Sequence, residues 1–310
     1  PAVPRKSHRS SGRESGEAMG CAWEGLLAVV YFAVGPASLK KAALSAASAR
    51  KHGGARVRTM VVTDDAGASR LRRGEYAFDT VESVGRAKGP SVEFSATRPL
   101  GSTSTLSTSE RWRNRTDPAN VALRALRAAK IDALERALKR YDRAVFLDAD
   151  TYVCKPIVED LGCAVEPPTA VAFVPVAAGK EHAASILAAS ARWRVPRTVR
   201  EANTGVVAAR NDSTTRALVR AWRRAYEDLA QQSGFLMDQP AFRAALHATG
   251  APHAHLPPEF NCRGHDRHAA QTAVALRCRG FRHLKGPVQT RLRGGRGCAV
   301  LHSHDLREPS

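Results

Sequence analysis

The segment Ala144–Thr151, which reads AVFLDADT, decides how this sequence is expected to fold. Its first four residues are apolar and predict a short buried strand. Side chains two residues apart in an extended chain point to the same side, so Asp148 and Asp150 are expected to present their carboxylates together where the strand ends. Two convergent carboxylates suit a hard divalent cation, and such a cation can hold a pyrophosphate.

The sequence on both sides of this segment predicts an α/β fold. Apolar strands are expected at 26–34 and 58–63, with an Ala-rich helix at 37–50 between them, and this order implies a right-handed parallel crossover. Further strands are expected at 77–84, 170–174, 205–209 and 299–301, and helices at 120–139, 181–192, 213–229 and 239–247. Residues 86–118 are polar and predict a long loop. The alternation favours one Rossmann-like domain, a mixed and mostly parallel sheet flanked by helices, which binds ligands beyond the carboxyl ends of its strands.

Composition and charge narrow the classes of partner. The chain has 310 residues, 43% of them hydrophobic and 25% charged, so a packed core is expected. A net charge of +19 attracts polyanions and anionic small molecules. The basic residues are spread along the whole chain without zinc-finger or RNA-binding motifs, so no nucleic-acid partner is expected. A phosphate-bearing small ligand would benefit from the same field.

The ends of the chain and its cysteines carry weaker signals. Residues 1–25 precede the first expected strand and are assigned to a disordered lead, because residues 1–20 are polar.

None of the six cysteines forms a CxxC pair, which makes a structural zinc site unfavourable. A chain of this size does not need disulfides, so buried free thiols are expected. No apolar run is long enough to span a membrane. The chain starts at Pro1, so a preceding signal or anchor segment stays open.

Two other interpretations of the acidic pair and the charge stay open. Haloacid-dehalogenase-like phosphatases begin with a similar segment, and by this resemblance Asp148 would be a nucleophile and Asp150 a general acid/base. That family has its aspartates near the start of the domain, whereas almost half of this chain precedes Asp148, so this alternative is the weaker one. The charge of +19 also fits a non-catalytic protein that binds polyanions or acidic glycans.

Four further motifs follow the acidic strand in a characteristic order. They are Asn203–Val207 (NTGVV), Met237–Phe242 (MDQPAF), Leu256–Asn261 (LPPEFN) and Ala299–His304 (AVLHSH). Together with AVFLDADT, this set resembles the metal-dependent nucleotide-diphospho-sugar transferases of the glycogenin-like and family 8 galactosyltransferase-like kind. The resemblance runs from about Val29 to Asp305. It implies a single GT-A domain over 26–310, with a nucleotide-binding half at about 26–150 and an acceptor half at about 151–310.

The resemblance implies a metal site. Asp148, Asp150 and His302 would hold Mn²⁺ or Mg²⁺, which neutralises the diphosphate of the donor and improves the leaving group. A set of oxygen and imidazole ligands suits Mn²⁺ better than Ca²⁺. His304 is an alternative ligand, because residues two apart in a strand share a face.

The resemblance also places residues around the nucleotide. Tyr31 and Ala33 would border it, with Tyr31 stacked on the base, although core packing explains Tyr31 nearly as well. Asp64 would lie near the uracil or ribose, or would cap the end of a strand. Lys130 would reach the donor phosphates or extend to solvent, with Arg127 as a weaker substitute.

Residues around the donor sugar complete the implied site. Asn203 would bind sugar or acceptor hydroxyls, or would form a turn before the next strand. Asp238 and Gln239 would be the catalytic residues that stabilise an oxocarbenium-like state, or Asp238 would be the N-cap of a helix. The family's Gly and Lys-Pro-Trp after the metal histidine are absent, and Arg307 is the candidate replacement for the lysine.

The expected function is therefore that of a glycosyltransferase, hexosyltransferase-like and retaining, with no covalent nucleophile assigned. A UDP-sugar is the expected donor, and a glycan or protein is the expected acceptor. Such enzymes often work in the Golgi lumen behind a membrane anchor, which would lie outside this chain. A cytoplasmic location is the alternative.

Overall fold

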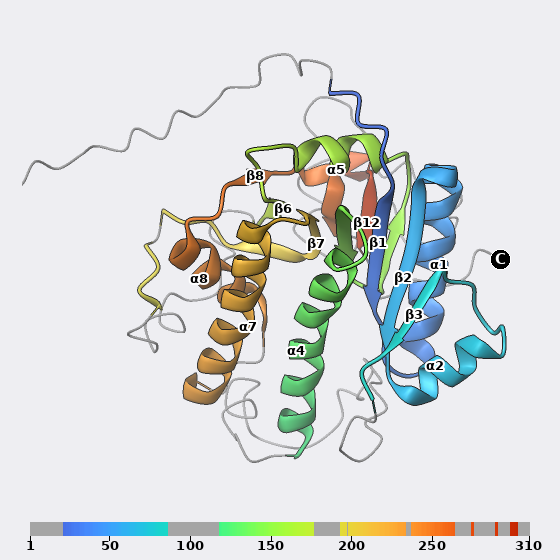
Figure 1. Cartoon of the computed structure of the whole chain (residues 1–310), viewed down its shortest axis with the longest axis horizontal. Helices are drawn as coiled ribbons and strands as arrows, with labels where there is room; N and C mark the ends of the chain where they lie inside the picture. Colours follow the sequence, from blue (N-terminus) through green and yellow to red (C-terminus); the bar gives the residue numbers. More distant parts are fainter. Residues whose placement is uncertain are drawn as a thin grey trace, which may run out of the picture.

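The computed structural model describes residues 21–85, 118–176, 193–196, 198–233, 237–263, 274–275, 289–290 and 298–302. Its centre is a seven-stranded sheet in the order β3-β2-β1-β4-β7-β6-β8 (Figure 1). The strands are β1 (Leu27–Phe32), β2 (Val57–Thr63), β3 (Thr80–Ser83), β4 (Arg143–Leu147), β6 (Val171–Pro175), β7 (Ala202–Arg210) and β8 (His253–His255). β7 is antiparallel to both neighbours, and the other pairs in this sheet are parallel. The predicted mixed, mostly parallel sheet is confirmed.

Helices cover both faces of this sheet. They are α1 (Pro36–Gly53), α2 (Asp65–Arg72), α4 (Pro118–Leu138), α5 (Val158–Ala164), α7 (Ser213–Ser233) and α8 (Gln239–Thr249). Alternate residues of β1 enter two separate cores: Ala28 and Val30 pack with α4, α7 and α8, whereas Val29 and Tyr31 pack with α1 and α5. A strand that is covered on both faces must be apolar throughout, which explains the unbroken run in the sequence. Among the described residues, no helix combines the length and apolar character that crossing a bilayer requires.

A second, smaller sheet brings the end of the chain to the acidic segment. β12 (Val300–His302) lies between β5 (Thr151–Val153) and β9 (Cys262–Arg263). It is antiparallel to β5, with His302 opposite Thr151, and parallel to β9. A short 3-10 helix, η3 (Pro258–Asn261), leads into β9, and another, η1 (Gly54–Arg56), precedes β2. A separate hairpin-like pair joins β10 (Val274–Ala275) to β11 (Gln289–Thr290). His302 therefore reaches Asp150 through β-pairing between residues 151 apart in the sequence.

Some element boundaries differ from the sequence-based prediction. β7 begins at Ala202, so Asn203 belongs to a strand and not to a turn before it. α4 begins at Pro118, where a loop was expected. The short strands β5, β8 and β9 were not predicted at all. The expected helix 181–192, residues 86–117, residues 1–20, His304 and Arg307 lie outside the described residues.

The expectation of free thiols is wrong. Cys21 is bonded to Cys163 and Cys262 to Cys298, and Cys154 is also in a disulfide. None of the cysteines in the described ranges is free. The first pair is separated by 142 residues, so nothing local in the sequence marks the two cysteines as neighbours.

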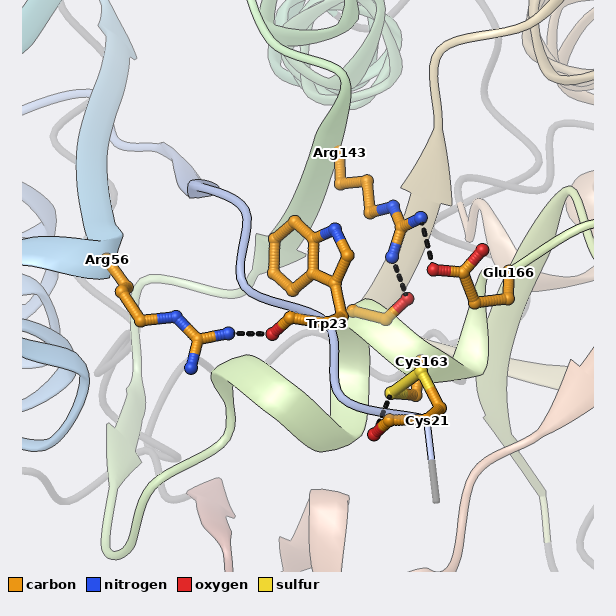
Figure 2. The surroundings of a disulfide bond; sticks show 7 residues. Cys21, Trp23, Arg56, Arg143, Cys163 and Glu166 are labelled. Carbon is orange, nitrogen blue, oxygen red and sulfur yellow. Dashed lines mark hydrogen bonds and ion pairs between the residues drawn. A yellow bond between two sulfur atoms is a disulfide. The ribbon is translucent and has the colours of Figure 1, made fainter. Parts of the chain in front are cut away.

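Residues 21–25, assigned to the lead from the sequence, are attached to the body of the fold (Figure 2). The Trp23 ring lies 4.6 Å from the guanidinium of Arg143 and 5.8 Å from that of Arg56. Arg143 also donates to the carbonyl of Gly162 and to Glu166, both at 2.6 Å. The disulfide and these contacts form an N-terminal clamp that joins the segment before β1 to α5 and to the start of β4.

Candidate metal and donor-sugar site

The two aspartates lie in the tight connection between β4 and β5. Asp148 directly follows β4, and its backbone N–H donates to the carbonyl of Gly205 in β7 at 2.9 Å. The hydroxyl and the backbone N–H of Thr151 both donate to the Asp148 carbonyl, at 2.8 and 3.1 Å. These bonds hold the turn so that both carboxylates emerge on one side at the carboxyl end of β4.

His302 completes a group of three possible metal ligands. Its Nε2 lies 3.2 Å from Oδ1 of Asp150 and 3.7 Å from Oδ2 of Asp148. One ligand atom from each of the three residues lies within 4.8 Å of the other two. His302 is only 6% exposed, so the imidazole is held in place by its surroundings. Two carboxylates and one imidazole form a donor set suited to a divalent ion such as Mn²⁺.

Gly205 gives this group its space. A Cβ at this position would lie 2.9 Å from Oδ2 of Asp148 and 2.9 Å from Cε1 and Nδ1 of His302. Any other residue would push against two of the three ligands, because real Cβ atoms avoid such short contacts. The glycine in the middle of a buried strand is therefore explained by close approach of side chains. The chemistry of the donor set and the room left by Gly205 both fit a bound cation.

Lys130 of α4 lies between Asp148 of the candidate metal group and Asp238. Its Nζ lies 2.9 Å from Oδ1 of Asp148 and 3.0 Å from Oδ2 of Asp238, above the ring of Phe146. Burial lowers the pKa of Lys130, but the two carboxylates outweigh burial and raise it above its ordinary value. The lysine is 5% exposed and charged, so its side chain does not extend to solvent.

Asp238 faces the same interior. Its carboxylate accepts from Thr204 Oγ1 at 2.9 Å, and Arg127 lies 3.7 Å away. Burial raises the pKa of Asp238, but Lys130 and Arg127 outweigh burial and lower it to about 2. Asp238 precedes α8 without a side-chain capping bond, so its carboxylate serves the site and not the helix end.

Two amides lie next to these charges. Gln239, the first residue of α8, donates from Nε2 to Oδ1 of Asn203 at 3.4 Å. The same oxygen accepts from the backbone N–H of Gly205 at 3.0 Å. Both amide side chains are buried beside Asp238 and the metal ligands. The structure therefore brings together Asp148, Asp150, His302, Lys130, Asp238, Gln239 and Asn203.

Comparisons with known proteins give a fold but no sequence relative. No protein-family model and no curated protein sequence matches the chain. Mouse xyloside xylosyltransferase 1, solved in its apo form, superposes with a TM-score of 0.51 at 11% identity, over 90% of this chain and 98% of that one. The galactosyltransferase LgtC, solved with donor and acceptor sugar analogues, has a TM-score of 0.53 at 14% identity, over 91% of this chain and 88% of that one. The chain has a GT-A fold.

Tyr31, which was predicted to stack on the base of the nucleotide, lies in the core of this GT-A fold. Tyr31 is fully buried, its hydroxyl accepts from Ser45 at 3.0 Å, and its ring packs edge-on against Phe78. Burial raises its pKa. Tyr31 therefore packs in the core, and its ring is not presented for stacking on a base.

Asp64 and Ala33 lie at the carboxyl ends of β2 and β1, the edge of the sheet that also carries Asp148. Asp64 follows β2, where the alternative interpretation expected a strand-end cap, but its side chain caps the start of α2 by accepting from the backbone N–H of Gly67 at 2.9 Å. Ala33 is 1% exposed and donates its N–H to Val62. Their contacts with a nucleotide stay predictions.

Three residues of the site were given no role by the sequence. Gly205 and Thr204 lie in a quoted motif, and a glycine inside an apolar run was an available signal for close approach. Asn261 closes another quoted motif, and its Oδ1 lies 3.1 Å from Nδ1 of His302. No local sequence pattern identifies Asn261, because its partner His302 is 41 residues away in the sequence.

Proposed function

We propose that this chain is a metal-dependent glycosyltransferase that moves a sugar from a nucleoside-diphosphate sugar to an acceptor. The observation that carries the proposal is the convergence of Asp148, Asp150 and His302 within 4.8 Å at the carboxyl end of β4. The carboxyl ends of strands are where α/β sheets bind nucleotides. The fold shared with a xylosyltransferase and a galactosyltransferase supports the same reaction class.

The proposed roles at the diphosphate follow from charge. Asp148, Asp150 and His302 would hold Mn²⁺ or Mg²⁺, and a bound cation offsets the charge of the departing diphosphate. Lys130 keeps a permanent positive charge beside Asp148, where it holds the carboxylate in position. Arg127, which is about one-third exposed, adds a second cation next to Asp238.

The proposed roles at the sugar follow from the buried polar groups. Asp238 is ionised at neutral pH because its pKa is about 2, so it can stabilise positive charge that develops at the anomeric carbon. The amides of Gln239 and Asn203 are suited to orient sugar hydroxyls. We propose UDP-sugar as the donor, a glycan or protein as the acceptor, and retention of configuration without a covalent nucleophile.

The disulfides support a location in an oxidising compartment. Disulfides persist in the secretory pathway and are rare in the cytosol, where thiols are kept reduced. At least five of the six cysteines are bonded in this chain. We propose the Golgi or another endomembrane lumen as the location.

The proposed function is tested by nucleoside-diphosphate release. Purified protein is incubated with a panel of nucleotide sugars and Mn²⁺, and release of the nucleoside diphosphate of each donor is measured with and without a chelator. We expect release from at least one donor, its loss on chelation, and a fall of about 100-fold or more in Asp150→Asn, since a metal ligand is removed. Asp160→Asn, an exposed aspartate on α5, is the matched control and should be unaffected.

Release that is insensitive to both chelator and Asp150→Asn would contradict the metal role. Strongly salt-dependent binding to a sulfated polyanion, with no affinity for any nucleotide sugar, would favour the polyanion-binding alternative instead.

A further inference from the structure

The ring nitrogen of His302 that faces away from the acidic pair has a partner of its own. Nδ1 of His302 lies 3.1 Å from Oδ1 of Asn261. Both side chains are buried, with 7% of Asn261 and 6% of His302 exposed. A buried hydrogen bond of this kind fixes both the position and the protonation pattern of an imidazole.

Asn261 is attached rigidly to the strand that carries His302. It ends η3, and the next residue, Cys262, is bonded to Cys298 and pairs with Leu301 of β12. The backbone N–H of Ala299 donates to the carbonyl of Glu259 at 2.7 Å. The backbone segments that carry the amide and the imidazole are therefore held together by a disulfide, strand pairing and a backbone hydrogen bond.

The direction of this hydrogen bond decides whether His302 can bind a metal. Nε2 faces Asp148 and Asp150, so Nε2 must carry a lone pair to act as a ligand, and the proton must then lie on Nδ1. Oδ1 of Asn261 accepts that proton's hydrogen bond. If the amide were turned over, its NH₂ group would donate to Nδ1, the ring proton would move to Nε2, and the ligand lone pair would be lost.

The orientation of the Asn261 amide has a cost that is visible in the structure. With Oδ1 directed at His302, Nδ2 of Asn261 is buried without a hydrogen-bond partner in the described part of the chain. A buried polar atom without a partner is costly, so this orientation is retained for what Oδ1 does. The one function of Oδ1 visible in the structure is its contact with the histidine.

We propose that Asn261 is a positioning residue that holds His302 in the Nδ1-protonated tautomer with Nε2 directed at the cation. This inference rests on the proposed metal site. Hydrogen-bond partners of ligating histidines affect metal affinity by 10- to 100-fold. Asn261 therefore controls the affinity for the cation although it does not contact it.

The test compares two substitutions of Asn261 by calorimetric titration with Mn²⁺ alone. Asn261→Leu keeps the approximate volume but removes the acceptor, and should weaken Mn²⁺ binding 10- to 100-fold. Asn261→Asp keeps an acceptor oxygen and should bind Mn²⁺ within a few-fold of wild type. Leu301→Ala, a buried change on the opposite face of β12, controls for general damage to the strand and should leave the affinity unchanged in folded protein.

A second readout does not need the metal. ¹⁵N spectra of histidine-labelled apo protein should show His302 with its proton on Nδ1, and a mixture of tautomers in Asn261→Leu, with His302→Gln used to assign the signal. Equal Mn²⁺ affinity in wild type and Asn261→Leu, or a wild-type proton on Nε2, would overturn the positioning role alone. A wild-type protein that binds no Mn²⁺ would overturn the metal site and this inference together.

Discussion

Lys130 is the residue at which the two acidic parts of the site meet. It contacts Asp148 of the candidate metal group and Asp238, and all three side chains are at least three-quarters buried. Removing one partner of a buried ion pair leaves an uncompensated charge, which is far more damaging than removing an exposed pair. The site therefore depends on Lys130 for its structure as well as for its charge.

The low pKa of Asp238 predicts a pH-dependent contribution to stability. The pKa is about 2 in the folded protein against an ordinary 3.8, so the ionised carboxylate stabilises the fold above pH 4 by about 2 kcal/mol, and this contribution is lost as the pH falls toward 2. Urea unfolding should show wild type more stable than Asp238→Asn at pH 7, with a smaller difference at pH 2.5. A stability difference that does not change between these pH values would contradict the assignment.

Gly205→Ala is predicted to damage metal binding more than folding. The added Cβ would lie 2.9 Å from both Asp148 and His302, so one ligand must move. We expect Mn²⁺ affinity to fall by 10-fold or more, measured by calorimetry. Gly250→Ala is the matched control: it strains the left-handed residue that ends α8 by about 1 kcal/mol without touching the site. Equal Mn²⁺ affinity in both variants would show that Gly205 has no special role.

The three residues of the candidate metal group could be named from the sequence, whereas the core packing of Tyr31 could not be separated from nucleotide binding. Asp148 and Asp150 follow an apolar strand at an edge where α/β sheets bind ligands, and His302 ends an apolar triplet that was joined to them through a family resemblance. Tyr31 also lies in an apolar strand, but it packs in the core, where Ser45 donates a hydrogen bond to its hydroxyl. A contact between neighbouring elements has no signature within either segment, so packing and binding could not be separated from the sequence.

At the scale of elements, β4 carries the N-terminal clamp at its start and the candidate metal group at its end. Arg143 at its start belongs to the N-terminal clamp, and Asp148 follows its end, about 16 Å away along an extended chain. The clamp connects the segment before β1 to α5 at the start of β4 (Figure 2), whereas the candidate metal group follows the end of β4. Changes in the clamp should therefore affect stability without affecting the site.

The double variant Cys21→Ser/Cys163→Ser tests this separation. Loss of a bond that closes 142 residues should lower the free energy of unfolding by about 3 kcal/mol, measured as a lower Tm. Mn²⁺ affinity should stay within a few-fold of wild type. The matched pair Cys262→Ser/Cys298→Ser lies beside Asn261 and should weaken Mn²⁺ binding as well. Equal effects of the two double variants on Mn²⁺ affinity would contradict the separation.

Long elements were more predictable than short ones. Apart from β8, the strands of the main sheet and the helices α1, α4, α7 and α8 extend over enough residues for an apolar pattern to be visible. β5 and β9 have three and two residues, too few for any pattern, whereas the apolar triplet before His302 did predict β12. These short strands bring His302 to Asp150, so the sequence predicted the ligands through a family resemblance and not through the sheet that unites them.

At the scale of the whole molecule, the fold and the net charge are both compatible with the proposed function. The main sheet presents Asp148 of the candidate metal group at the carboxyl end of β4, and a net charge of +19 would attract the anionic donor proposed above. The fold class followed from the alternation of strands and helices. The acceptor could not be predicted, because no motif in the second half of the chain states which group it binds.

The central claim is that Asp148, Asp150 and His302 hold one divalent cation. Calorimetric titration of the purified, metal-free protein with Mn²⁺ tests it most directly. We predict one site in the wild type, binding weakened at least 10-fold in Asp150→Asn, and unchanged binding in Asp160→Asn. No Mn²⁺ binding by folded wild-type protein, or equal binding by wild type and Asp150→Asn, would contradict the account.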